Sequence, residues 1–295
     1  MFNDPEKTLK IYQKRKKPLE QKSFLPDELV KLVDFVFKEQ LKVAGQISSV
    51  MGPETVLTPS HQLVNGKPLL PRESFSLDHQ ATRDLLLRLL KYLKESRGQL
   101  SEAAEQIQKE LDADENFLDR ALQKYLAGDD DFFRKFGEKT PAVPRCLNFL
   151  VQAGATPSIA RTADALSLLL PRGKTWNQGH CPVCGSLPYI SELREKQGFR
   201  YLHCSFCHSA YLFKRMACPF CSTEKSDSFQ YFETREIPGV RVHVCTSCSL
   251  YIKTIDFREM DKKVLPPLDD LESLPLDIKA KEEGYNRPTL SVWGF

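Results

Sequence analysis

Two common features are missing from this 295-residue chain. The first 145 residues contain no cysteine, and no stretch approaches the ~20 consecutive apolar residues of a membrane span. The N-terminal MFNDPEKTLKIYQKRKKPL is basic but has no apolar stretch after its charges, unlike a signal peptide. We therefore expect a soluble, cytoplasmic protein with no membrane span. In that reducing compartment, paired cysteines favour metal or redox chemistry over structural disulfides.

A strong charge of either sign is also missing. The sequence has 42 Lys and Arg against 39 Asp and Glu, a net charge of +3. That excess is too small to predict attraction of the whole chain to nucleic acid or anionic lipid. There is no H-E-x-x-H, no G-x-S-x-G, no phosphate loop and no dinucleotide-binding glycine pattern. These absences predict that the protein is not an enzyme, although they leave a thiol-redox activity open.

The first half of the chain has the pattern of a helical domain. Residues 1–24 form a basic N-terminal arm, with seven Lys and Arg against three acids. We expect a solvated or frayed terminus there, the alternative being a docking arm for an acidic surface. Residues 25–172 repeat apolar residues at helical spacing and predict a helical bundle, with a long loop over 46–76. Pro171 and Gly173 break the helical pattern and mark a domain boundary.

The second half changes to short segments rich in aromatic and β-branched residues, such as GFRYLH, SFQYFET and LYIKTIDF, which predict short antiparallel strands. Residues 173–216 would form a first four-cysteine module and 217–258 a second. The tail, 259–295, is expected to contain a short helix packed against the body. The predicted fold class is therefore α+β, a helical N-terminal domain followed by two tandem rubredoxin-like or zinc-ribbon modules.

Eight of the nine cysteines form four C-x-x-C pairs within 68 residues. The pairs are Cys181/Cys184, Cys204/Cys207, Cys218/Cys221 and Cys245/Cys248. The gaps between them are 19, 10 and 23 residues. The long gaps can form hairpins that bring two turns together, whereas the short gap suits a link between two finished modules. We therefore expect the first four cysteines to bind one metal ion and the last four another.

An internal repeat supports this pairing. One module opens with CPVC and continues to RYLHCSFC, and the other opens with CPFC and continues to RVHVCTSC. In each, an arginine (Arg200 or Arg241) stands four residues before the third cysteine. The CSFCH stretch matches a haem-attachment signature. Haem is disfavoured, because it would leave the first pair without partners and break the repeat at Ser249, the counterpart of His208.

Four thiolates around one ion form a closed tetrahedral site, which has no open position for a substrate and disfavours Lewis-acid catalysis. The spacing does not distinguish iron from zinc, so each site can be structural or redox-active. His180, His203, His208 and His243 lie near the pairs and are expected to support them rather than to bind metal. The ninth cysteine, Cys146, adjoins helical apolar residues and is expected to be a buried, inert thiol.

Longer stretches around the cysteines form a more specific pattern than any single pair. They are HCPVCGSLPYIS, GFRYLHCSFCHSAYLFKRMACPFC, VHVCTSCSLYIKTID and LDDLESLPLDIKAKEEGY. Their order and gaps over residues 178–285 resemble the formate dehydrogenase accessory protein family, FdhE. The resemblance implies a cytoplasmic, non-catalytic helper that binds the catalytic subunit of a respiratory formate dehydrogenase before export and supports its maturation. It also implies that the eight paired cysteines are metal ligands in rubredoxin-like sites, which can hold iron.

Two other functions are kept as alternatives. A zinc-ribbon protein can bind nucleic acid, but residues 181–258 hold only ten Lys and Arg against seven acids, so we expect no such partner. A thiol–disulfide oxidoreductase would use one C-x-x-C pair, usually on a helix that follows a strand, and four pairs in hairpins do not fit that setting. The sequence leaves a homodimer open.

Overall fold

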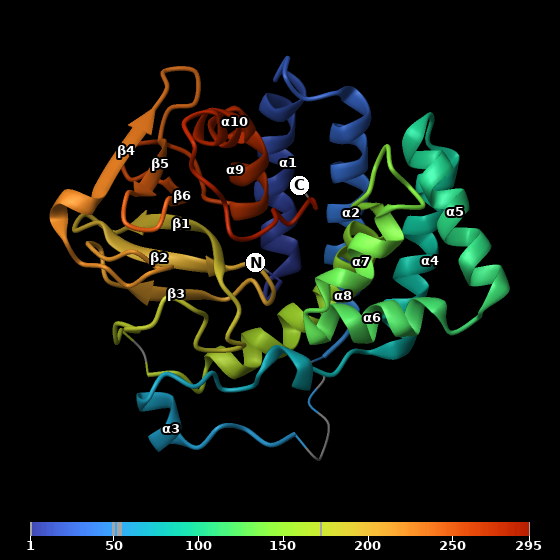
Figure 1. Cartoon of the computed structure of the whole chain (residues 1–295), viewed down its shortest axis with the longest axis horizontal. Coiled ribbons are helices and arrows are strands. Elements are labelled where there is room, and N and C mark those ends of the chain that lie inside the picture. Colours follow the sequence, from blue (N-terminus) through green and yellow to red (C-terminus); the bar gives the residue numbers. More distant parts are fainter. Residues whose placement is uncertain (1, 49–50, 52–54, 172, 295) are drawn as a thin grey trace.

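The computed structural model describes residues 2–48, 51, 55–171 and 173–294, and it places a helical half beside a sheet half (Figure 1). This arrangement confirms the α+β class predicted from the sequence. The helices of the first half are α1 (Pro5–Glu20), α2 (Asp27–Gln46), α3 (Ser60–Val64), α4 (His79–Glu95), α5 (Gln99–Ala113), α6 (Phe117–Ala127), α7 (Asp130–Gly137) and α8 (Cys146–Ser167), with a short 3₁₀ helix, η1 (Arg72–Ser74), before α4. Among the described helices, none combines the length and the apolar character needed to cross a membrane.

Helix α8 is the centre of the helical half. Eighteen of its 22 residues are buried, which is typical of a helix surrounded by other helices rather than of one at a surface. It contacts α2, α4, α5, α6 and α7. A Cβ atom at Gly154 would lie 2.5 Å from Cδ2 of Leu86, so glycine at this position allows α4 to pack closely against α8.

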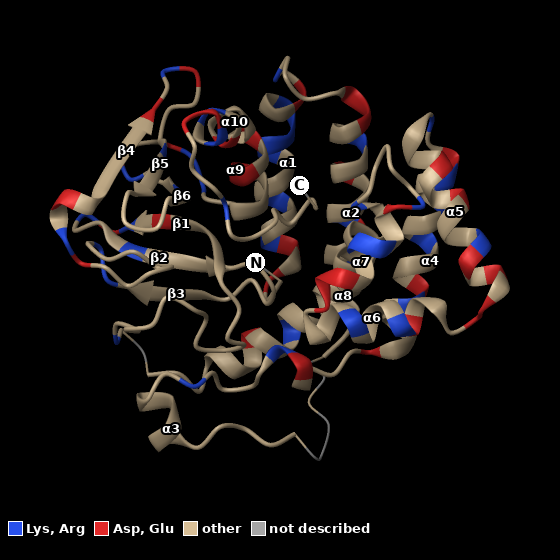
Figure 2. Ribbon diagram, viewed as in Figure 1, with Lys and Arg blue, Asp and Glu red and all other residues tan. Residues whose placement is uncertain are grey.

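The expectation of a solvated or frayed N-terminus is wrong, because residues 5–20 form the ordered helix α1. Its sequence has the signals of a helix start, with Asp4 accepting a hydrogen bond from the Lys7 amide at 3.0 Å and proline in the first turn. One face of α1, which includes Arg15 and Leu19, is buried. Figure 2 shows the basic residues of α1 beside the acidic residues of α9. The sequence does not reveal this buried face, because many lysines lie among the apolar residues of α1.

The strands form one six-stranded sheet in the order β3-β2-β1-β6-β5-β4. They are β1 (Pro188–Arg194), β2 (Phe199–Cys204), β3 (Ala210–Phe213), β4 (Phe229–Glu233), β5 (Val240–Cys245) and β6 (Leu250–Ile255), with a 3₁₀ turn η2 (Ser226–Ser228) before β4. Each module is an antiparallel three-stranded meander, as the short strands predicted. The sequence did not predict the junction, where β1 and β6 pair in parallel, with Ile190 opposite Lys253.

Two apolar cores lie behind the sheet. The larger contains the helical half together with the first module, including Leu202 and Phe206. The smaller lies between the second half of the sheet and the tail, and it includes Val242, Ile255 and Leu276. The first module is therefore packed into the helical body rather than appended to it. The domain boundaries predicted from the sequence stay predictions.

The tail contains two consecutive short helices where the sequence predicted one. Helices α9 (Pro266–Glu272) and α10 (Leu274–Glu282) lie between the sheet and α1 (Figure 1). Nη2 of Arg15 lies 2.6 Å from Oδ1 of Asp269 and 2.9 Å from Oε1 of Glu272. These buried ion pairs join the first helix to the tail.

Candidate metal centres

The first group of cysteines lies in two turns of the first module. One turn precedes β1 and the other joins β2 to β3, and they bring four sulfur atoms within 4.8 Å of one another. We call this group site 1; its members are Cys181, Cys184, Cys204 and Cys207. Sγ of Cys181 lies 3.6 Å from Sγ of Cys207, and Sγ of Cys184 lies 3.3 Å from Sγ of Cys204. All four side chains are at most 3% exposed, so the protein encloses site 1.

The second group repeats this arrangement in the second module. One turn follows β3 and the other joins β5 to β6. We call this group site 2; its members are Cys218, Cys221, Cys245 and Cys248. Sγ of Cys218 lies 3.8 Å from Sγ of Cys248, and Sγ of Cys221 lies 3.7 Å from Sγ of Cys245. Site 2 is less enclosed, because Cys221 is exposed and Cys248 is only half-buried.

Both groups fit a tetrahedral ion. Metal–sulfur bonds of about 2.3 Å place the four sulfurs of a tetrahedral site about 3.8 Å apart, close to the separations in both groups. Thiolate sulfur is the donor that zinc and the iron of rubredoxin-type sites prefer. In the described part of the chain, these two are the groups of three or more Cys, His, Asp or Glu side chains that could hold an ion. The structure thus brings the eight paired cysteines together as the first four and the last four.

The backbone turn at each pair is the same. The residue that follows the second cysteine has a left-handed conformation in every case: Gly185, His208, Ser222 and Ser249, with φ between 57° and 82°. After Gly185 the chain directs the Ser186 amide at Sγ of Cys184, at 3.5 Å. Within the same turn the Val183 amide donates to Sγ of Cys181 at 3.4 Å. The repeat found in the sequence is therefore a repeat of four equivalent turns, each of which presents two sulfur atoms.

The surroundings disfavour the thiolate form of several cysteines in the two groups. Burial raises the pKa of the Cys181 and Cys207 thiols well above the usual value, and it raises the pKa of the Cys218 thiol to about 11. A bound cation reverses this preference, because it compensates the negative charge of four thiolates at once. Burial also acts against the thiolate of one further cysteine in each group, Cys184 in site 1 and Cys245 in site 2, but hydrogen bonds to sulfur outweigh it and lower the pKa of that thiol. Each group is therefore suited to a metal ion, because without a cation its four sulfurs do not all ionise.

Arg200 is a buried cation between the two modules. From the sequence it is evident only as a repeated position, matched by Arg241. It extends from β2, is 5% exposed, and donates from Nη1 to the main-chain oxygen of Ala217 at 3.0 Å, next to Cys218. Burial lowers the pKa of Arg200 to about 10. Arg241, its counterpart in the repeat, instead pairs with Glu233 at 2.6 Å near the surface. The two modules therefore have different electrostatic surroundings despite their similar sequences.

The four histidines contribute to neither sulfur group. Nε2 of His180 lies 2.7 Å from the main-chain oxygen of Gly66, which joins the first turn to the loop before α4. Nε2 of His203 lies 2.9 Å from Oε2 of Glu192, and Nδ1 of His243 lies 3.0 Å from Oγ1 of Thr254. These three histidines thus hydrogen-bond to residues around the cysteines.

His208 is half-buried with both ring nitrogens enclosed, and Cys146 is a buried thiol. His208 provides a left-handed turn residue, its ring packs against Phe2 with 5.9 Å between ring centroids, and neither ring nitrogen has a partner among the described residues. Cys146 begins α8 and is 5% exposed, as the sequence predicted, and burial raises the pKa of its thiol to about 12. The haem reading of CSFCH is disfavoured by this geometry, because both of its cysteines face the first pair.

The fold and the two sites together define a class: a helical body joined to a duplicated four-thiolate sheet module. Family models described as "FdhE, central domain" and "FdhE, C-terminal domain" match residues 180–215 and 216–293. The Protein FdhE homolog of Haemophilus influenzae (strain PittEE) is 30% identical over 303 residues, which cover 100% of this chain and 91% of that protein. The chain therefore belongs to the FdhE family.

Two further comparisons agree with this assignment. The Protein FdhE homolog of Aquifex aeolicus (strain VF5) is 35% identical over 152 residues, 50% of this chain and 52% of that protein, so the match spans about half the length of the relative. The crystal structure of the FdhE protein from Pseudomonas aeruginosa has a TM-score of 0.63, covers 90% of this chain and 88% of its own, and is 22% identical. At that identity it supports the shared fold alone.

Proposed function

We propose that this protein is a non-catalytic accessory factor that binds the catalytic subunit of a respiratory formate dehydrogenase in the cytoplasm and supports its maturation or activation. Membership of the FdhE family supports the partner. The single observation that carries the non-catalytic role is the closed geometry of the two sulfur groups. Four thiolates leave an ion no free position for a substrate, so the sites fit structure, sensing or electron transfer rather than Lewis-acid chemistry.

The eight cysteines of sites 1 and 2 would hold two metal ions per chain, iron or zinc. When bound, such an ion supplies folding free energy to a small module and, if it is iron, a one-electron couple. The chain itself contributes the turn amides that donate to sulfur, the enclosed surroundings of site 1 and the buried guanidinium of Arg200 beside site 2.

The thiol–disulfide alternative is less well supported. It needs one C-x-x-C pair free to cycle between dithiol and disulfide, usually at the start of a helix. Here every pair lies in a turn beside a strand, and its sulfurs face those of a second pair. The nucleic-acid alternative needs a basic surface on the modules, whereas Arg194, Arg241 and Lys214 are each paired with a carboxylate.

The proposal is tested by retention of metal-loaded protein on an immobilised formate dehydrogenase catalytic subunit in oxygen-free buffer. We expect specific retention, and none on the catalytic subunit of an unrelated molybdenum enzyme of similar size. Equal retention on both subunits, or on neither, would contradict the proposed partner.

The metal content is measured on the same preparation. We expect about two ions per chain, falling to about one in Cys184→Ser and to about one in Cys221→Ser, because each variant opens a different site. Iron would show thiolate charge-transfer absorption, and zinc would be colourless. A metal-free protein with oxidisable cysteine pairs would instead favour the oxidoreductase.

A further inference from the structure

A cavity of about 800 Å³ lies where several parts of the chain meet. Its walls are helix α8, the two turns that carry Cys184 and Phe206, residues 287–290 of the tail, the segment before α4 and the region of α6 and α7. Figure 1 shows α8 running from the helical half toward the sheet, so the cavity lies at the boundary of the two halves. Neither sulfur group needs an open cavity of this kind to hold an ion.

Two carboxamide side chains on α8 line the cavity and make no hydrogen bond to the described residues. Asn148 is 4% exposed, and its Oδ1 is buried with no partner among the described residues. Gln152, one turn further along, is 6% exposed, and its side chain also bonds to none of the described residues. By contrast, the buried carboxamide of Gln40 donates to the main-chain oxygen of Ala153 at 2.9 Å. Because buried polar groups are ordinarily hydrogen-bonded, the unpartnered Oδ1 of Asn148 indicates a ligand, and Gln152 offers a second carboxamide one turn away.

The spacing of these side chains matches a repeating ligand. Four residues along α8 separate Asn148 from Gln152 by about 6 Å, and an extended chain presents N–H and C=O groups on one edge about every 6.7 Å. Each carboxamide offers both a donor and an acceptor, the complement of a main-chain amide. We propose that the cavity binds an extended polypeptide segment through its main-chain amides, with Asn148 and Gln152 as the anchors. The inference rests on the proposed function and names the surface that receives the partner protein.

The other walls suit a polypeptide better than a nucleic acid. The rings of Tyr125 and Phe206, with centroids 5.7 Å apart, line the same cavity and give side chains an apolar surface. The lining also carries charges of both signs, and Arg145, Glu73 and Asp130 form no ion pair with the residues that the structure describes. Three arginines on the lining are matched by three carboxylates, so the cavity lacks the excess of positive charge that binds a phosphate backbone. The main chain of a polypeptide is neutral and needs no such excess.

Site 1 forms part of the cavity wall. The Ser186 amide donates to Sγ of Cys184 at 3.5 Å, and the Phe206 amide donates to Sγ of Cys204 at 3.4 Å. Oγ of Ser186 also lines the cavity and is buried without a partner among the described residues. None of the cysteines of site 2 is among the residues that line it. Binding of the segment should therefore require an intact site 1 and not an intact site 2.

The test uses fluorescein-labelled, overlapping peptides of a formate dehydrogenase catalytic subunit, titrated with full-length, metal-loaded protein and followed by fluorescence anisotropy. We expect Asn148→Ala/Gln152→Ala to raise the Kd of the binding peptide about tenfold or more, because it removes roughly two to four hydrogen bonds. Its melting temperature should stay near that of the wild type, since neither side chain is bonded within the described chain. The matched control is Gln13→Ala/Gln123→Ala, which removes two exposed carboxamides outside the cavity.

Main-chain recognition is tested separately with the same peptide N-methylated at its central amides. This change should weaken binding to the wild type about tenfold and make little further difference to the Asn148→Ala/Gln152→Ala variant. Cys184→Ser should also weaken binding, whereas Cys221→Ser should leave it unchanged. Equal effects of the two cysteine variants would overturn the dependence on site 1.

The outcomes separate this inference from the proposed function. If the wild type binds the subunit and Asn148→Ala/Gln152→Ala binds it equally well, the cavity is not the site, and the proposed function stands. If Asn148→Ala/Gln152→Ala binds weakly only because its melting temperature has fallen, the two side chains have a structural role. That result also overturns the proposal that the cavity binds the segment. If the wild type fails to bind the subunit and all of its peptides, the proposed function and the cavity inference fail together.

Discussion

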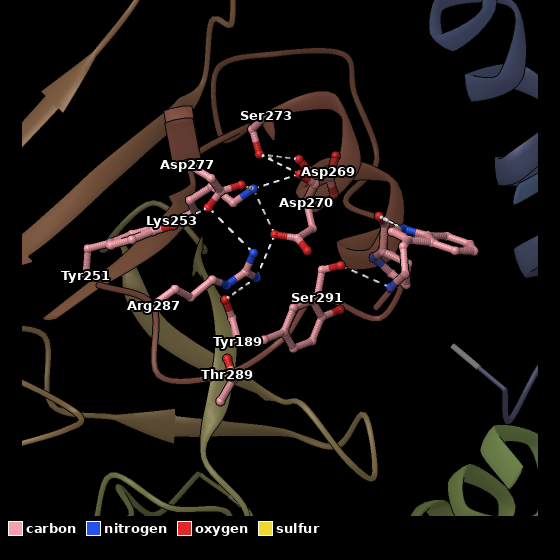
Figure 3. Close-up of polar contacts among 12 residues, drawn as sticks. Tyr189, Tyr251, Lys253, Asp269, Asp270, Ser273, Asp277, Arg287, Thr289 and Ser291 are labelled. Atoms are coloured by element: carbon pink, nitrogen blue, oxygen red, sulfur yellow. Dashed lines mark hydrogen bonds and ion pairs between the residues drawn. The ribbon is translucent and has the colours of Figure 1, made fainter. Parts of the chain in front are cut away.

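Nζ of Lys253 on β6 lies 2.8 Å from Oδ1 of Asp270 on α9, and both side chains are at most 1% exposed. Arg287 donates to the same oxygen at 2.7 Å, and Oδ2 of Asp277 lies 2.5 Å from Nζ of Lys253 (Figure 3). Arg287 also donates to the main-chain oxygen of Tyr189 on β1 at 2.9 Å. Two cations and two carboxylates therefore compensate one another inside the protein, behind the junction of the two modules.

Asp270→Asn leaves Lys253 and Arg287 with a single carboxylate, that of Asp277. Removing one partner of a buried ion pair typically costs about 3–5 kcal/mol, and we expect a loss of that size in the free energy of unfolding. Urea denaturation of the metal-loaded protein measures it. The control is Glu224→Gln, which removes an exposed partner of Lys214 and should change the stability by less than about 1 kcal/mol. A loss at Asp270 no larger than the control would contradict the prediction.

These charges make stability depend on pH. Burial opposes the ionisation of Asp270 and Glu272, but the charges of Arg287 and Arg15 respectively outweigh it and lower the pKa of each carboxyl. A lowered folded-state pKa stabilises the fold above the unfolded value of about 4, and that stabilisation is lost as pH falls through the folded-state pKa. We therefore expect the free energy of unfolding to decrease below about pH 4.

Asp269 titrates in the opposite sense, because burial raises its pKa to about 6. Its contribution declines as pH rises from about 4 to 6, so the two effects occupy different pH ranges. Acid also releases metal from thiolates. Urea denaturation over one pH series therefore compares the free energy of unfolding of the wild type with that of Glu272→Gln. The variant should show the smaller decrease below about pH 4; parallel curves would count against the assignment to Glu272.

Metal loss should begin at site 2. Cys221 is exposed and Cys248 is half-buried, whereas every cysteine of site 1 is at most 3% exposed. A chelator in excess should therefore remove the two ions in two phases, the faster from site 2. Absorption or a chelator dye follows the release. Cys221→Ser should abolish the fast phase and keep the slow one, and a single phase in the wild type would disprove the asymmetry.

The left-handed turns predict an unequal response to substitution. Ser249 has φ of 57° and an exposed side chain, so Ser249→Gly should raise the stability by up to about 1 kcal/mol. Ser249→Val should lower the stability, because a β-branched side chain is strained in this conformation. Thermal unfolding of the metal-loaded protein measures both.

Gly185 is the matched position in the first module. Its φ is 82°, and an added Cβ would lie 3.1 Å from Cγ of Pro68. Gly185→Ala should therefore destabilise the protein where Ser249→Gly stabilises it. Opposite signs at the two positions are the expected result, and equal signs would refute the equivalence of the turns.

The sequence was most informative where the signal is local. Cysteine spacing and the CPVC/CPFC repeat predicted which sulfurs would group, because a C-x-x-C turn and its hairpin involve nearby residues. The parallel pairing of Ile190 with Lys253 joins strands from different modules. The sequence of neither strand indicates which other strand it pairs with. The cavity carboxamides Asn148 and Gln152 had no signal at all, because an asparagine or glutamine within a helical pattern looks the same whether it faces solvent or a cavity.

The N-terminal segment was misassigned for a related reason. Seven basic residues in the first 24 suggested a solvated arm, but the carboxylate that pairs with Arg15 at 2.6 Å lies 254 positions later, at Asp269. A charge is ordinarily read as a surface feature. Only the tertiary fold shows that this one is compensated and buried.

That separation of Arg15 from Asp269 and Glu272 sets an order of events during synthesis. A ribosome adding about 5–20 residues per second delivers the two carboxylates roughly 10–50 s after the arginine. Through that interval α1 can pack against α2, as Tyr12 does on Phe37, but Arg15 has neither of its two carboxylate partners. The contact between α1 and α9 therefore forms only after the tail has been made.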